Sequence, residues 1–259
     1  MIYFKYIQMI VRSFLQYRLS FWLTTMAQTF VSFFSFLGIY LLFERFGTLA
    51  GWTFGEVALC FAVTQMVFAI TECFARGFDL FSGLIVSGDF DRVLLRPRGT
   101  VVQVLGSSFE LTRLGRLVQS SVVLGLAVSW LETGWTVMKA VTLVFMILSG
   151  IFIFLGVFIL GASFCFLTVQ GLEVINIFTD GGREIAGYPL TIYNKWVARF
   201  FTFIIPFGCM NYLPLLNITD RAGAHPWLYM LSPLLGIAFL LPCLWVWRRG
   251  VGRYLSTGS

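Results

Sequence analysis

Long runs without a charged residue constrain this chain more than any other feature of its sequence. The stretch from Ser20 to Phe43 carries no charge and is long enough to cross a hydrocarbon layer of about 30 Å as an α-helix. Only 12% of the residues are charged, whereas soluble domains carry roughly 25%. We therefore expect an all-α integral membrane protein that forms a single transmembrane domain over residues 1–259.

Hydropathy predicts five membrane spans whose positions are clear. They are Ser20–Phe43, Phe54–Ala75, a segment that ends at Trp130, Val137–Leu167 and Trp227–Trp247. Before the first span, residues 1–18 place polar side chains at helical spacing among aromatic ones, which is typical of an amphipathic helix in the membrane interface. The alternative is that this segment is only the irregular start of the first span.

The remaining span has two candidate positions. Hydropathy alone places it at 197–215, which leaves 170–194 in the cytoplasm. The other reading places it at 168–189 and makes 196–215 a re-entrant hairpin on the far side, a reading favoured by two prolines and an asparagine that interrupt this segment. A span at 168–189 must carry four charged residues, which are tolerated only if they pair or face an aqueous path. These residues are Glu173, Asp180, Arg183 and Glu184.

The distribution of basic residues predicts which side of the membrane each connection occupies. With the span at 197–215, 15 of the 18 lysines and arginines lie on the side of the two termini and 3 lie on the other. The re-entrant reading changes these counts to 12 and 5 and places Arg183 within the span. Because lysine and arginine concentrate in cytoplasmic connections, both readings place the termini and residues 76–116 in the cytoplasm, with six spans in all.

The densest charge in the chain lies within this cytoplasmic segment, over residues 88–98. Asp89 can cap a helix and Pro97 ends it, which leaves about two helical turns between them. The residues that would share one face of this helix, at i, i+3 and i+4, are Phe90, Val93 and Leu94. A short helix with an apolar face, held outside the membrane, is suited to contact another protein. The alternative is an ordinary solvated loop.

A second polar cluster lies in an otherwise apolar part of the chain. Its members are Asp180, Gly181, Gly182, Arg183 and Glu184. The acidic and basic groups are close enough in sequence to neutralise one another, and paired glycines permit a break or a tight turn. One interpretation is a helix break with a local salt bridge. The other is a polar element that lines or gates a path across the membrane.

Two carboxylates, Glu56 and Glu72, lie near the ends of the second span. We interpret them as end charges, with Glu72 paired to Arg76 one helical turn further on. Together with Asp180 they also allow an alternative function, that of an ion-coupled secondary transporter. The spans show no obvious inverted repeat, which weighs against this class.

Several other classes of function find no support. One histidine and five scattered cysteines without C-x-x-C spacing predict neither a metal site nor a disulfide framework. The chain has no G-x-x-x-x-G-K-[ST] motif, so we do not expect it to bind nucleotide phosphates or to be an enzyme. Its arginines are dispersed at segment ends, without a stripe suited to nucleic acid.

Four motifs resemble those of the ABC-2 type transporter permeases. Gly88–Pro97 reads GDFDRVLLRP, which is similar to the G…D..L.RP loop of one bacterial subfamily. Three later motifs are similar to that subfamily as well, at Phe178–Glu184, Tyr188–Tyr193 and Phe201–Pro206. The resemblance covers essentially the whole chain. One departure is Phe164–Leu167, where a Phe-Trp pair would be expected.

The resemblance implies the membrane subunit of an ATP-driven exporter in the cytoplasmic (inner) membrane of a bacterium. Two permease copies would form the path, and two copies of a separate ATPase would bind ATP and Mg²⁺. Some members of the subfamily are viologen or multidrug exporters. The resemblance also implies a re-entrant hairpin on the outer face, which we place at 196–225.

Within this chain the resemblance implies a coupling helix that contacts the ATPase. Its predicted residues are Asp89, Phe90, Asp91, Arg92, Val93, Leu94, Arg96 and Pro97. In this hypothesis the three apolar residues seat in a groove of the ATPase, and the charges of Asp91 and Arg92 set the register.

Overall fold

The computed structural model describes residues 18–131, 133–168, 171–223 and 226–254. Over these residues the chain is almost entirely helical and contains no strand. The helices in chain order are α2 (Arg18–Phe46), α3 (Phe54–Asp79), α4 (Phe81–Val86), α5 (Asp89–Leu94), α6 (Thr100–Leu105), η1 (Leu111–Arg113), α7 (Leu114–Trp130), α8 (Val137–Phe164), α9 (Gly171–Ala186), η2 (Leu190–Ile192), α10 (Lys195–Phe203), α11 (Phe207–Met210), α12 (Tyr212–Ile218), α13 (Pro226–Leu231), α14 (Pro233–Ala238) and α15 (Leu240–Val251). The interfacial helix predicted at 1–18 lies outside the described residues except for Arg18.

Among the described residues, five helical segments are long and apolar enough to cross a membrane, and they confirm the five clear spans of the sequence. They are Arg18–Phe46, Phe54–Val86, Leu111–Trp130, Val137–Phe164 and Pro226–Val251. The total becomes six if the bent pair at 195–218 is counted as one span. The fold is therefore that of a multi-pass α-helical membrane protein.

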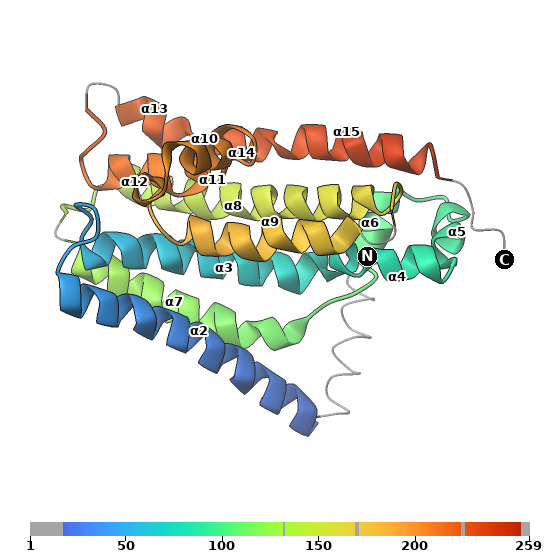
Figure 1. Cartoon of the computed structure of the whole chain (residues 1–259), viewed down its shortest axis with the longest axis horizontal. Coiled ribbons are helices and arrows are strands. Elements are labelled where there is room, and N and C mark those ends of the chain that lie inside the picture. The colour runs from blue at the N-terminus through green and yellow to red at the C-terminus, as the bar shows by residue number, and fades with distance from the viewer. Residues whose placement is uncertain (1–17, 132, 169–170, 224–225, 255–259) are drawn as a thin grey trace.

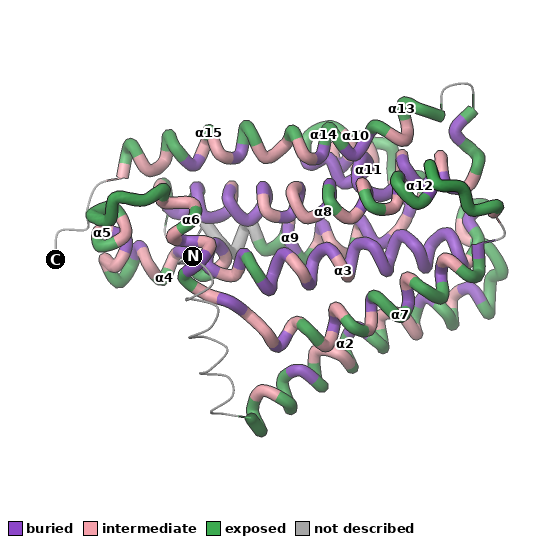
Figure 2. The backbone as a smooth tube through the Cα atoms, turned by 180° about the vertical axis from the view of Figure 1, so that it is seen from behind, coloured by how far each residue is buried: buried purple, intermediate pink, exposed green. Residues whose placement is uncertain are grey.

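The most buried span is α3, which lies at the centre of the bundle. In its most apolar window 83% of the residues are buried inside the protein, against 17% for α2. Figure 1 shows the elements in layers, with α15 above α8 and α9, α3 below these, and α7 and α2 at the far side. Figure 2 shows the resulting gradient from the buried α3 to the exposed α2. A helix as exposed as α2 is left to face lipid or another chain.

The bundle has two ends, which we name by residues found there. The α5 end carries α4, α5, α6 and the C-terminal end of α15 (Figure 1). The Trp52 end carries the turn between α2 and α3, where Gly47 and Gly51 adopt left-handed φ angles of 71° and 82°. Glycine adopts such angles without steric cost, which allows this turn to be short.

The segment that follows α9 is a broken helix, as the two prolines predict. α10 and the stretch Phe207–Ile218 meet at an angle of 76°. Both flanks of this hairpin lie at the Trp52 end, because Trp52 Nε1 donates to Thr191 Oγ1 (2.8 Å) and Arg221 Nη1 donates to the Gly51 carbonyl (3.3 Å). The hairpin therefore leaves and returns to the same end of the bundle.

The tip of the hairpin is fixed deep inside the bundle by Asn211, which is buried. Its Nδ2 group donates to Thr64 Oγ1 (2.6 Å) and to the carbonyls of Cys60 (3.1 Å) and Ala186 (2.7 Å). These bonds join α3, the end of α9 and the hairpin at one point. An amide that satisfies several acceptors at once orients the segments around it.

The course of α9 follows from its two neighbours in sequence. Phe166, just before it, packs on Trp247 with ring centroids 5.3 Å apart, at the α5 end. Thr191, just after it, is bonded to Trp52 at the other end. α9 therefore runs the length of the bundle beside α8 and α3 (Figure 1).

Candidate functional site

A charged cavity of about 370 Å³ lies among α2, α3, α7, α8 and α9. Its lining is almost entirely polar. It consists of Gln28, Phe68, Glu72, Arg76, Asp79, Arg113, Arg116, Phe158, Asn176, Thr179, Asp180 and Arg183. Four guanidinium groups and three carboxylates therefore share a small space inside a bundle that is otherwise apolar.

Glu72 of α3 is the acceptor for two arginines. Its carboxylate lies 2.7 Å from Arg116 Nη1 and 3.2 Å from Arg113 Nη2, and all three side chains are at least 87% buried. Arg116 also donates to Gln28 Oε1 on α2 (2.8 Å). The carboxylate of Glu72 thus links α3 to η1 and α7 by charge-assisted bonds, and Arg116 extends the network to α2.

This arrangement corrects the predicted pair of Glu72 and Arg76. Arg76 instead pairs with Asp79 and approaches Glu110 at 3.9 Å. The reason is that Glu72 points to α7, where two arginines are available, whereas Arg76 lies beside the connection that leads to α7. The spacing of Glu110, Arg113 and Arg116 was a signal in the sequence that the start of the third span needs partners of opposite charge.

The second group of charges in the cavity comes from α9. Arg183 lies 2.8 Å from Glu184 and 3.6 Å from Asp180, and its guanidinium stands 4.9 Å from the centre of the Phe68 ring. The local salt bridge predicted for this cluster is therefore present. Arg183 joins α9 to α3 through the ring of Phe68, since a cation over an aromatic face is attracted to it.

The helix break that the paired glycines allow does not occur, because α9 continues from Gly171 to Ala186. Gly182 serves a different purpose. A Cβ atom at this position would lie 2.6 Å from the ring of Phe207, so glycine permits α9 to pack closely on α11. Gly181 faces open space. The two glycines therefore have different environments, which the sequence alone does not distinguish.

One face of α9 is exposed although the helix runs beside α3 and α8. It carries Asn176, Ile177, Asp180 and Glu184. The carboxylate side chains of Asp180 and Glu184 are 63% and 57% exposed. Asn176 and Asp180 also line the charged cavity, so this polar face and the cavity form one continuous surface.

The helix predicted between Asp89 and Pro97 is present as α5, which ends at Leu94, and Asp89 is its first residue and not its cap. The cap is Gly88, with a left-handed φ of 73°. Asp89 Oδ1 accepts a hydrogen bond from Arg92 Nη1 (2.8 Å), and Ser87 Oγ donates to Asp89 Oδ2 (3.0 Å). Glycine fits this position because it adopts the left-handed region readily, which explains the first residue of the motif.

Phe90 does not lie on a free surface, contrary to our prediction that it seats in a partner groove. It is fully buried inside its own chain. Its ring packs at 5.0 Å from Phe81 (α4), 5.6 Å from Phe166 (end of α8), 6.3 Å from Trp247 (α15) and 5.1 Å from Tyr254. We call these five rings the aromatic cluster.

The remaining predicted residues of α5 divide between the cluster and the surface. Val93 is half-buried and packs against the core. Leu94 is 40% exposed, and the side chain of Arg92 is 75% exposed. Arg96 and Pro97 are exposed beyond the helix. Asp91 lies beside Tyr254, and burial together with the nearby Asp91 carboxylate raises the pKa of the tyrosine.

A separate group of contacts fixes the hairpin at the Trp52 end. Glu56, whose side chain is 6% exposed, lies 2.8 Å from Arg221 Nη2 and accepts a bond from the Thr53 amide (2.7 Å). Arg221 stands 4.7 Å from the centre of the Trp52 ring. Glu56 is therefore a structural end charge, as its position in the sequence indicates.

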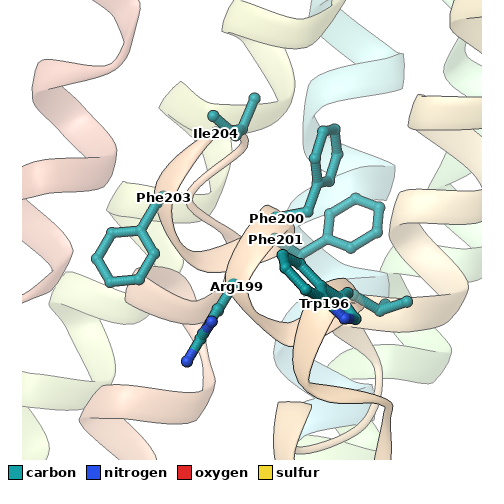
Figure 3. Close-up of a pocket in the computed structure, with 7 residues that line it drawn as sticks. Trp196, Arg199, Phe200, Phe201, Phe203 and Ile204 are labelled. Atoms are coloured by element: carbon teal, nitrogen blue, oxygen red, sulfur yellow. The ribbon is translucent and has the colours of Figure 1, made fainter.

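A shallow apolar pocket of about 590 Å³ follows α10 at this end of the molecule. Figure 3 shows the residues that line it, among them Trp196, Arg199, Phe200 and Phe203. Trp196 and Phe203 are 76% and 80% exposed. The outer surface of the hairpin is therefore mainly aromatic.

Within the described residues, no group of three or more histidines, cysteines, aspartates or glutamates is placed to hold a metal ion. All five cysteines are buried as free thiols. In the charged cavity four guanidinium groups face three carboxylates.

The comparison with known families gives a direct answer. A family model described as "ABC-2 family transporter protein" matches residues 29–258. No curated protein and no solved structure gives a significant match. The matched region runs from within α2 onward and includes α5 and every residue of the charged cavity except Gln28. The chain belongs to the ABC-2 family of transporters and is a multi-pass membrane permease.

Proposed function

We propose that this chain is the permease subunit of an ATP-driven exporter. It works as a dimer in the cytoplasmic membrane of a bacterium, and a separate ATPase supplies the energy. The observation that carries the proposal is the exposed polar face of α9, which is continuous with the charged cavity between α9 and the central helix α3. The description of the matching family supports transport as the activity.

We take α9 as the fifth span. Its neighbours in sequence lie at opposite ends of the bundle, whereas both flanks of the hairpin lie at one end. This arrangement supports a re-entrant hairpin at 196–225 and a crossing at 168–189. The alternative crossing at 197–215 would require its two flanks to lie at opposite ends.

The polar face of α9 needs a polar neighbour. Asp180 and Glu184 are more than half exposed, and each charge facing lipid at mid-membrane would cost roughly 2.5–3.5 kcal/mol. A face of this kind is stable next to water or another polar surface. A second permease copy that faces α9 removes the carboxylates from lipid and encloses an aqueous path between the two copies.

The α5 end faces the cytoplasm in this proposal and carries the contact with the ATPase. The count of basic residues supports a cytoplasmic position for the α5 end, where the ATPase would bind. Because Phe90 is buried in the aromatic cluster, it anchors α5 to the permease and does not touch the partner. Leu94 and Leu95, 40% and 84% exposed, form the apolar contact, and Arg92 sets its register.

The mechanism follows from this placement. ATP and Mg²⁺ bind to the two ATPase subunits, and closure of that pair moves α5. The movement shifts the permease pair between two arrangements, since a ligand biases whichever state it binds better. The ion-coupled alternative is less well supported, because Glu56 and Glu72 are both held by arginines in the interior.

The proposal is tested by affinity purification in mild detergent, with identification of the chains that co-purify. We expect an ATP-binding cassette subunit, and we expect the double variant Leu94→Ser/Leu95→Ser to lose most of it. Val137→Ser is the matched control, since Val137 is 80% exposed at the other end. Purification of the wild-type chain without any ATPase would contradict the proposal.

A further inference from the structure

The last residues described in the chain are held against α5. Tyr254 packs on Phe90 with ring centroids 5.1 Å apart and on Phe166 at 5.9 Å. Trp247, which is fully buried, packs on Phe81 at 5.0 Å. The aromatic cluster thus joins α5 and α4 to the end of α8 and to the residues that follow α15.

Polar contacts join the same elements. Trp247 Nε1 donates to Thr100 Oγ1 at the start of α6 (3.0 Å). Gln103 Nε2 of α6 donates to the carbonyls of Val93 (3.1 Å) and Arg98 (3.0 Å). Bonds and rings together make α5, α6 and the C-terminal end of α15 a single body. Whatever moves α5 also moves residues 248–254.

The exposed surface of this body is strongly basic. Two carboxylates belong to it, Asp89, which pairs with Arg92, and Asp91. Six arginines of this body are exposed. Arg92, Arg96 and Arg98 lie in α5 or just after it, and Arg248, Arg249 and Arg253 lie at the end of α15 or just after it. The surface therefore carries a clear excess of positive charge next to the exposed Leu95.

The distance of this surface from the membrane bears on what it contacts. α3 and α4 together form a helical segment of 33 residues from Phe54 to Val86, which spans about 50 Å. A bilayer with its headgroups is about 40–45 Å thick. With Phe54 at the outer surface, a segment of this length carries α5 to the inner headgroups or past them, within reach of a protein in the cytoplasm.

We propose that the C-terminal turn, Arg248–Tyr254, forms part of the docking surface for the ATPase, and that the ATPase presents an acidic surface to it. This inference rests on the proposed function. It adds a second contact to α5 and gives the last span a direct connection to the partner. α15 packs closely on α8, since a Cβ at Gly156 would lie 3.0 Å from Cys243 Sγ. Force on the turn therefore reaches the fourth and sixth spans together.

The test uses the full chain in nanodiscs and measures the affinity of the co-purifying ATPase. In the triple variant Arg248→Gln/Arg249→Gln/Arg253→Gln, affinity should fall roughly tenfold at low salt, from the loss of three exposed charge contacts. The difference from wild type should shrink at high salt. Arg45→Gln, an exposed arginine at the other end, should leave the affinity unchanged.

The lipid composition of the nanodiscs separates this proposal from binding to anionic lipid. The tenfold fall should be equal in discs of phosphatidylcholine alone and in discs that contain phosphatidylglycerol. A fall seen only with phosphatidylglycerol assigns the arginines to lipid and overturns the inference. Wild-type affinity in the triple variant, combined with a loss in Leu94→Ser/Leu95→Ser, also overturns it and leaves the proposed function intact. Wild-type affinity in both the triple arginine variant and Leu94→Ser/Leu95→Ser would also contradict the proposed contact of α5 with the ATPase.

Discussion

Glu72 of α3 accepts a hydrogen bond from Arg116 of α7 at 2.7 Å, and both side chains are more than 90% buried. Arg113 binds the other carboxylate oxygen at 3.2 Å. The group joins the central helix of the bundle to the start of the third span, on the wall of the charged cavity. If α7 moves relative to α3, the bonds of this group must therefore break, or the two helices must move together.

Removal of the carboxylate alone should be strongly destabilising. Glu72→Gln leaves two buried arginines without their anion, and breaking a buried pair in this way costs about 3–5 kcal/mol. We expect a fall of several degrees in the melting temperature measured in detergent. The double variant Glu72→Gln/Arg116→Gln should recover part of the loss, because it removes one of the unpaired charges. Additive losses would show that the two residues do not interact.

The polar face of α9 can be mapped with single cysteines. Asp180→Cys and Glu184→Cys should react with a small hydrophilic thiol reagent, because both positions face the proposed aqueous path. Ala186→Cys is the matched control, since Ala186 is 1% exposed and does not line the charged cavity. The native cysteines are buried and give a low background. Equal labelling at 186 and 180 would exclude a one-sided path.

The spans and the broken hairpin could be predicted from the sequence because they depend on local features. Hydropathy and proline act within a few residues, so Ser20–Phe43 and the break near Pro206 are visible without a structure. The partner of Glu72 was mispredicted for the opposite reason. Arg76 is nearest along the chain, but the carboxylate is oriented by the packing of α3 on α7, a contact between residues 44 positions apart.

Phe90 shows the same limit on the scale of one helix. Its spacing with Val93 and Leu94 correctly predicts an amphipathic α5. Periodicity identifies an apolar face but does not tell which surface covers it. Here Phe90 is covered by Trp247 and Tyr254, more than 150 residues away in the sequence. The face thus divides into an inner anchor and an outer edge that ends at Leu94.

A close contact of backbones between α3 and α6 should make one glycine irreplaceable. A Cβ at Gly77 would overlap the carbonyl oxygen of Val104, which cannot move without shifting α6. Gly77→Ala should therefore destabilise the protein by about 1–3 kcal/mol, as overpacking typically does. It should also weaken the coupling between ATPase binding and transport. Gly83→Ala is the control, since nothing lies within 4 Å of its Cβ position. Equal melting temperatures for the two variants would contradict the tight contact.

The anchor of the hairpin gives the last prediction. Arg221 neutralises Glu56, which is almost completely buried, and also covers the ring of Trp52. Arg221→Met should lower the melting temperature by several degrees, because it leaves a buried carboxylate without its cation. Since Arg221 is 40% exposed, the loss should be smaller than that of Glu72→Gln.

A double variant shows why Arg221→Met loses stability. Glu56→Gln added to Arg221→Met should restore most of the stability if the unpaired charge is responsible. Trp52→Phe, which removes the bond to Thr191 and leaves a smaller ring under Arg221, should then show a separate loss of at least about 1 kcal/mol. If the double variant is no more stable than Arg221→Met alone, Arg221 acts through its packing on Trp52. The hairpin would then be held at this end by an aromatic contact and not by its ion pair.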